Sequence, residues 1–100
     1  MEKNAGSVIV EFNNRAAAIY DASFERFHKS ILSVNRQKDD NVFRLQSSRY
    51  LTVLREQLEE EAKKILTENS GASFYDHLNV SLPSRIHFYL QEFNNRVNSL

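Results

Sequence analysis

The chain of 100 residues contains only three residues that readily interrupt a helix, namely Gly6, Gly71 and Pro83. Glycine and proline supply many of the tight turns in proteins, and both are unfavourable in helix interiors. A chain with so few of them has few places to turn, so long elements of secondary structure are expected. The length corresponds to one domain. We therefore expect a single helical domain over residues 1–100, with residues 1–6 forming a flexible N-terminus.

The first long segment, from about Ser7 to Arg36, carries apolar residues at helical spacing. Steps of four and three residues alternate between five of them, which places these side chains on one face of a helix: Tyr20, Phe24, Phe27, Ile31 and Val34. A second apolar stripe lies beside the first and contains Ile9, Phe12, Ala16 and Ile19. So wide an apolar face is typical of a helix that packs against two neighbours in a bundle.

A polar connection over residues 37–41 precedes a second predicted helix, which runs to about Asn69. Two Glu–Lys pairs stand four residues apart on it, Glu59 with Lys63 and Glu60 with Lys64, and are expected to support the helix. Asn69 and Gly71 then favour a helix end, because both tolerate the left-handed backbone conformation found there. The buried stripe of this helix is expected to contain Leu51, Leu54, Leu58, Ala62 and Ile65.

The last third of the chain predicts two helices rather than one. Ser73 can cap a short helix from Phe74 to about Val80, and Pro83 fits the first turn of a final helix that Ser81 caps. The apolar stripe of the final helix contains Leu82, Ile86, Tyr89, Phe93, Val97 and Leu100. The sequence therefore predicts an all-α protein, an elongated three-helix up-down-up bundle with a short extra helix before the last one.

An α+β fold with two short strands is the alternative architecture. Residues 8–12 include three consecutive β-branched residues, and residues 78–82 alternate between apolar and polar side chains. The two segments would pair with each other.

One pentapeptide occurs twice. Glu11-Phe12-Asn13-Asn14-Arg15 is repeated as residues 92–96, and similar apolar residues flank both copies. In each copy the glutamate and the arginine stand four apart and can pair on the exposed side, leaving the phenylalanine to point inward. Coincidence in an asparagine-rich chain is the other interpretation of this repeat.

Composition excludes several classes of protein. The 13 basic and 13 acidic residues cancel, which argues against a general polyanion-binding surface. No cysteine is present, so neither a disulfide framework nor a thiolate-based zinc site can form. No apolar run approaches the roughly 20 residues that cross a bilayer. We expect a cytoplasmic protein that does not enter a membrane.

No residue pattern indicates an enzyme, a metal site or a cofactor. Phosphate-binding glycine loops and nucleophile motifs are missing. The histidines, His28, His77 and His87, never stand three or four residues from one another, so a metal site would need them to converge with carboxylates such as Glu25 or Asp76. We expect no catalytic, cofactor-binding or metal-binding residues.

The long apolar faces instead favour a non-catalytic helical protein–protein interaction module, which docks a partner helix or associates with a second copy of itself as a homodimer. Aromatic side chains on these faces are the candidate partner-binding residues, because large rings dominate many interfaces. They are Phe24, Phe27, Phe88 and Phe93.

Charges along the second helix add two further hypotheses. The alternative function is a nucleic-acid-binding regulator, which would use polar and basic residues near the helix start: Arg44, Gln46, Arg49 and Arg55. The same helix is basic toward its start and acidic from Glu56 to Glu68. Such a gradient favours antiparallel pairing of two identical helices, because each basic half would face an acidic half.

Overall fold

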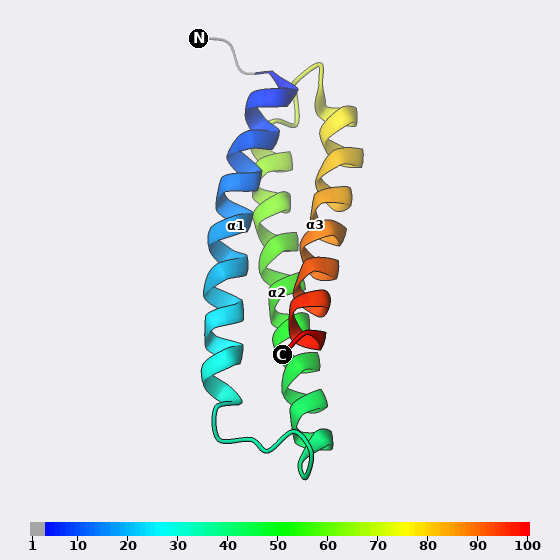
Figure 1. Ribbon diagram of the computed structural model, residues 1–100. Coiled ribbons are helices and arrows are strands. Elements are labelled where there is room, and N and C mark those ends of the chain that lie inside the picture. Colours follow the sequence, from blue (N-terminus) through cyan, green and yellow to red (C-terminus); the bar gives the residue numbers. More distant parts are fainter. Residues whose placement is uncertain (1–3) are drawn as a thin grey trace.

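A computed structural model describes residues 4–100 and contains three long helices, α1 (Ala5–Ser30), α2 (Asp40–Glu68) and α3 (Tyr75–Asn98). Consecutive helices run in opposite directions, so α1 and α3 are parallel and α2 is antiparallel to both (Figure 1). The bundle measures 54 × 20 × 18 Å. Its radius of gyration is 16.1 Å, against about 13 Å for a compact domain of this length. The predicted elongated three-helix bundle is therefore confirmed.

The alternative with strands is wrong. Residues 8–12 lie inside α1 and residues 78–82 lie inside α3, and residues 4–100 contain no strand. Val8, Leu78 and Leu82 are all buried in the core of the bundle. Packing of these side chains between helices therefore outweighs the β-propensity of their neighbours.

The start of α1 is tightly capped. The Asn4 side chain accepts a hydrogen bond from the Ser7 amide at 2.8 Å, and the Ser7 hydroxyl accepts one from the Asn4 amide at 3.1 Å. This reciprocal capping box satisfies two backbone donors that a helix start leaves free. Asn4 is therefore the capping residue and α1 begins at Ala5, within the predicted N-terminal segment 1–6, of which residues 1–3 lie outside the described residues.

The helix α1 ends at Ser30, six residues before the predicted end at Arg36. At this end the amides of Ile31 and Leu32 bond to carbonyls three residues earlier, and farther along the Asn35 side-chain oxygen accepts hydrogen bonds from the amides of Gln37 and Lys38. Such a local bond gives the backbone an alternative to the helix. Arg36 links this connection to both other helices. Its guanidinium donates a hydrogen bond to the Leu100 carbonyl, just after α3, and lies 4.4 Å from the centre of the Phe43 ring of α2.

The helix α2 ends at Glu68, close to the predicted position, but by a different device. No residue from 4 to 100 has a positive φ, so the left-handed ending predicted at Asn69 or Gly71 is wrong. The buried Asn69 side chain instead donates a 2.8 Å hydrogen bond to the Ile65 carbonyl and satisfies part of the open helix end.

The helix α3 is continuous through Pro83, so the predicted short extra helix before the last one is wrong. Neither Ser73 nor Ser81 caps a helix. Phe74 is the residue that precedes α3, and its side chain makes no capping hydrogen bond. The Ser81 hydroxyl lies inside α3, 3.4 Å from His77 Nε2. A proline inside a helix costs about 3 kcal/mol. Burying a leucine side chain contributes about 1.5–3 kcal/mol. Because residues on both sides of Pro83 are buried, packing offsets the cost; they are Leu78, Leu82 and Ile86.

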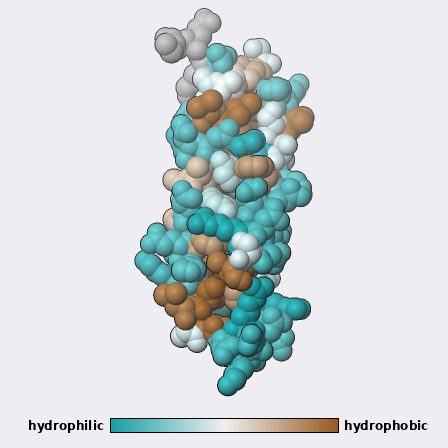
Figure 2. Space-filling model, in the orientation of Figure 1, coloured by the Kyte–Doolittle hydropathy of each residue, from teal (hydrophilic) through white to brown (hydrophobic). Residues whose placement is uncertain are grey.

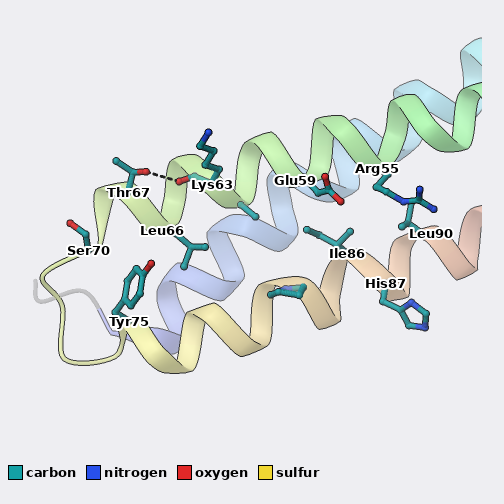
Figure 3. A pocket seen from close by; sticks show the side chains of 12 residues that line it. Arg55, Glu59, Lys63, Leu66, Thr67, Ser70, Tyr75, Ile86, His87 and Leu90 are labelled. Carbon is teal, nitrogen blue, oxygen red and sulfur yellow. Dashed lines mark hydrogen bonds between the residues drawn. The ribbon is translucent and has the colours of Figure 1, made fainter.

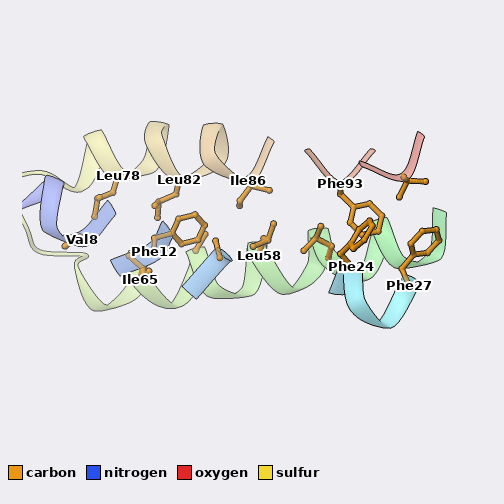
Figure 4. Close-up of a cluster of buried hydrophobic side chains, with 14 of the residues drawn as sticks. Val8, Phe12, Phe24, Phe27, Leu58, Ile65, Leu78, Leu82, Ile86 and Phe93 are labelled. Atoms are coloured by element: carbon orange, nitrogen blue, oxygen red, sulfur yellow. The ribbon is translucent and has the colours of Figure 1, made fainter. Parts of the chain in front are cut away.

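The core runs the whole length of the bundle and divides into two parts (Figure 4). The part near the start of α1 is mostly aliphatic and is formed by Val8, Phe12, Ala16, Leu58, Ala62, Ile65, Leu78, Leu82 and Ile86. The other part is aromatic. There the Phe27 ring lies 5.7 Å from Phe93 of α3 and 5.8 Å from both Phe43 and Tyr50 of α2, measured between ring centres. This aromatic cluster joins all three helices.

Polar side chains add contacts across the helix pairs. Arg85 donates to the Asn13 side chain at 2.9 Å, and the Tyr89 hydroxyl donates to the Asn13 carbonyl at 3.2 Å, which ties α3 to α1. Arg15 lies 2.6 Å from both Glu11 and Glu61 and so bridges α1 to α2. Its hydrogen bond to Glu61 raises the pKa of Arg15 above its usual value.

The two copies of the repeated pentapeptide share only the inward phenylalanine. Phe12 and Phe93 are both fully buried, as predicted. The predicted ion pair forms in the first copy, whereas Arg96 of the second copy lies over the Phe24 ring at 3.8 Å. Asn13 bonds to α3, while its counterpart Asn94 is exposed. The copies therefore do not dock alike beyond that ring.

None of the helices within residues 4–100 has both the length and the apolarity needed to cross a membrane.

We expect Phe93→Ala to lower the free energy of unfolding by about 3–5 kcal/mol, since it empties a buried site between three helices. Phe88→Ala is the matched control, because Phe88 is exposed on the same helix, and should cost less than about 1 kcal/mol. Urea denaturation followed by circular dichroism measures both. Equal losses in the two variants would contradict the assignment of Phe93 to the core.

We expect Pro83→Ala to raise the free energy of unfolding by about 1–3 kcal/mol, because alanine restores the missing backbone donor inside α3 and removes the ring clash. The same denaturation measurement tests this. An unchanged or lower stability would show that Pro83 lies at a helix boundary, as the sequence alone predicts.

Candidate helix-binding groove

The structure places three of the four predicted partner-binding residues inside the bundle. Phe27 and Phe93 are fully buried and Phe24 is 7% exposed. A partner could reach Phe27 and Phe93 only if the helices separated, whereas Phe24 borders a surface cleft beneath the Arg96 guanidinium. Phe88 alone is open to solvent, with 43% of its surface exposed. Its ring packs against Tyr89 at 5.4 Å and beneath the Arg85 guanidinium at 4.6 Å.

The four predicted nucleic-acid contacts do not share one face of α2. A helix turns by about 100° per residue, so Arg49 lies about 140° around the axis from Arg44, and Gln46 about 160° from it. Arg44 is also paired with Asp40 at 2.8 Å. Arg55 lies on the side of Arg44 but faces the groove described below. The structure therefore brings these residues to different sides of the bundle.

The histidines do not meet one another. Residues 4–100 contain no group of three or more His, Cys, Asp or Glu side chains that could hold a metal ion. The His28 ring stacks beside Phe24 at 6.3 Å, and Glu25, one turn away, pairs with Lys29 at 3.1 Å. His77 contacts Ser81, and His87 borders the groove between α2 and α3.

Figure 2 shows that the face formed by α1 and α3 is mostly hydrophilic. Hydrophobic side chains gather near its upper end and again in its lower third, over the end of α1 and the C-terminus (Figures 1 and 2). Leu32 and Leu100 are exposed residues of these segments. The two patches are separated by polar residues, so this face offers no continuous apolar stripe to a partner helix.

A continuous apolar surface lies instead between α2 and α3. We call it the α2–α3 groove; it is an open cavity of about 650 Å³. Figure 3 shows Ser70 and Tyr75 at one end and Arg55 and Leu90 at the other. Its lining residues are Arg55, Glu59, Ala62, Lys63, Leu66, Thr67, Ser70, Tyr75, Pro83, Ile86, His87 and Leu90.

The groove has an apolar floor and a charged edge. Ala62, Leu66, Ile86 and Leu90 supply aliphatic surface, and the small Ala62 side chain leaves room between the two helices. From Arg55 to Thr67 the groove follows α2 for about 18 Å, at a rise of 1.5 Å per residue. That length corresponds to about three helical turns, close to the mean length of protein helices.

The charged edge carries side chains that are free to contact a ligand. Arg55, Glu59 and Lys63 stand four residues apart along α2. The predicted Glu59–Lys63 and Glu60–Lys64 pairs are not among the ion pairs of residues 4–100. Thr67 is already engaged, since its hydroxyl donates to the Lys63 carbonyl at 2.9 Å.

Sequence reasoning missed this groove, although signals for it were present. Leu66 and Leu90 are apolar residues that lie just beside the predicted buried stripes of their helices. Neither residue indicates a groove alone, because its formation depends on how closely α2 and α3 approach.

A second cleft of about 610 Å³ separates α1 from α2. Its border is more charged, with Arg26 of α1 and Lys64 of α2 among three glutamates, and Ala18, Ile19 and Ala22 provide a small apolar area. The α2–α3 groove therefore offers the larger apolar floor for docking a helix.

The chain matches no model of a known protein family, and neither a curated protein nor a solved structure shows significant similarity to it. Arguments about function therefore depend on the surfaces of the bundle themselves.

Proposed function

We propose that this protein is a non-catalytic interaction module of the cytoplasm whose α2–α3 groove binds an amphipathic helix of a partner protein. The observation that carries the proposal is the apolar floor between two helices, open to solvent over about three turns. Helix-in-groove recognition uses such a surface, into which the apolar stripe of the bound helix fits. A bound helix would become the fourth helix of the bundle.

The apolar floor would supply most of the binding free energy. Leu66 and Leu90 are half-buried in the free protein, so a docked helix would remove their remaining surface from water. Each 100 Å² of apolar surface buried is worth about 2.5 kcal/mol before the cost of association.

The charged edge would select the partner. Arg55, Glu59 and Lys63 present positive, negative and positive charges at intervals of one turn. A helix with acidic, basic and acidic residues at the same intervals would match them, and the reversed pattern would be repelled. Exposed pairs of this kind contribute only about 0.2–1 kcal/mol each. They would therefore set register and specificity more than affinity.

Nucleic acid is the other class of partner that the sequence suggested. No observation on the structure favours it, because the four residues named for it lie on different sides of α2. The groove supports a protein helix instead.

A designed peptide tests the proposal. The probe is a fifteen-residue helix with leucines along one face and Glu, Lys and Glu flanking that face at four-residue intervals; a second peptide carries Lys, Glu and Lys instead. We expect the first peptide to bind more tightly, with amide shifts in ¹⁵N spectra concentrated at the groove residues. Shifts that map to other surfaces would contradict the proposal.

Two protein variants sharpen the same test. Leu66→Glu places a charge on the groove floor and should weaken peptide binding at least tenfold, about 1.4 kcal/mol. Val80→Glu is the matched control, because Val80 is exposed on α3 outside the groove. Thermal melts confirm that both variants fold. Equal binding by a folded Leu66→Glu variant would rule out the groove as the docking site.

A further inference from the structure

The face of α2 that points away from the core carries a separate apolar surface. Val42, Leu45 and Val53 are 45%, 53% and 43% exposed, respectively. Together with Arg49 they are spaced by three, four and four residues, so they form one stripe along the helix. This stripe continues through Glu56 and Glu60, and we call it the outer stripe of α2.

The outer stripe is distinct from the α2–α3 groove. It shares no residue with the groove lining, although Glu56 and Glu60 also border the cleft between α1 and α2. All six of its residues are exposed. Single exposed apolar residues are ordinary, but three on one stripe form a surface that a second helix could cover.

Charges on the outer stripe are arranged around Val53. Arg49 precedes Val53 by one turn and Glu56 follows it by one turn. Neither makes an ion pair within residues 4–100, where the four pairs involve other residues. A surface with a positive charge on one side of an apolar centre and a negative charge on the other is complementary to itself when rotated by half a turn.

We infer that the outer stripe pairs with the same stripe of a second copy of this chain, in an antiparallel arrangement with a two-fold axis beside Val53. Arg49 of each copy then faces Glu56 of the other. A parallel arrangement would place Arg49 against Arg49 and Glu56 against Glu56, so charge repulsion excludes it.

The antiparallel arrangement also covers Leu45 and Val53, whereas Val42 lies opposite Lys63 at the end of the contact. Leu45 of one copy lies against the aliphatic stem of Glu60 of the other, and the two Val53 side chains meet at the axis. The surface is narrow and only partly apolar, so the expected dimer is weak and forms at high protein concentration.

Charge exchange tests this inference without disturbing the fold, because the altered side chains are exposed. In sedimentation equilibrium at submillimolar concentration we expect the unaltered protein to dimerise. Arg49→Glu and Glu56→Arg should each raise the dissociation constant of the dimer at least fivefold. The double variant carrying both changes should dimerise again. An equimolar mixture of the two single variants should form a mixed dimer, since every facing pair is then of opposite charge.

Several results would overturn the inference. They are a monomer at submillimolar concentration, single variants that dimerise as well as the unaltered protein, or a double variant that stays monomeric. Leu66→Glu separates this inference from the proposed function, because it alters the groove and leaves the outer stripe intact. If Leu66→Glu abolished the dimer and both charge variants retained it, the second copy would bind in the groove. That result would refute the outer stripe as the contact.

Discussion

The packing of the Phe27 ring against aromatic rings of both neighbouring helices is the interaction on which the rest of the bundle depends. Phe93 of α3 lies at 5.7 Å, and Phe43 and Tyr50 of α2 lie at 5.8 Å. Tilted and edge-on aromatic pairs add about 0.5–1.5 kcal/mol each beyond the apolar area that they bury. A bundle only 20 × 18 Å across has room for few such rings. Because this cluster fixes the spacing of all three helices at one end, it also fixes which side chains remain outside.

Helical spacing in the sequence was sufficient to predict the three long helices and most of the buried stripes. Phe27, Leu58 and Val97 are buried where the periodicity places them. Spacing identifies an apolar face, however, and does not identify what covers it. Phe24, Phe27 and Phe93 were therefore expected to contact a partner, whereas they contact one another within the chain.

The sequence predicts several helix ends wrongly, and the physical cause is the same each time. The local conformational preference of a residue competes with packing or with side-chain hydrogen bonds. Pro83 favours a helix start locally, but α3 continues through it because buried residues lie on both sides, Leu78 and Leu82 before it and Ile86 after it. After α1 ends, the Asn35 side chain accepts hydrogen bonds from two amides and forms a turn where the sequence predicts the last residues of the first helix. The α2–α3 groove could not be predicted at all, since it arises from the distance between two helices. On α2, core, groove and outer stripe occupy three different sides, which makes this helix the centre of the proposed interactions.

The assignment of the aromatic cluster to a single chain is tested most directly by isotope-filtered NMR on a mixture of ¹³C-labelled and unlabelled protein at high concentration. The three-helix core predicts strong NOEs from the Phe27 ring to Phe43 and Phe93 within the labelled chains, and none from these rings between labelled and unlabelled chains. NOEs between chains from Phe24, Phe27 or Phe93 would contradict it, because a second copy would then complete the core.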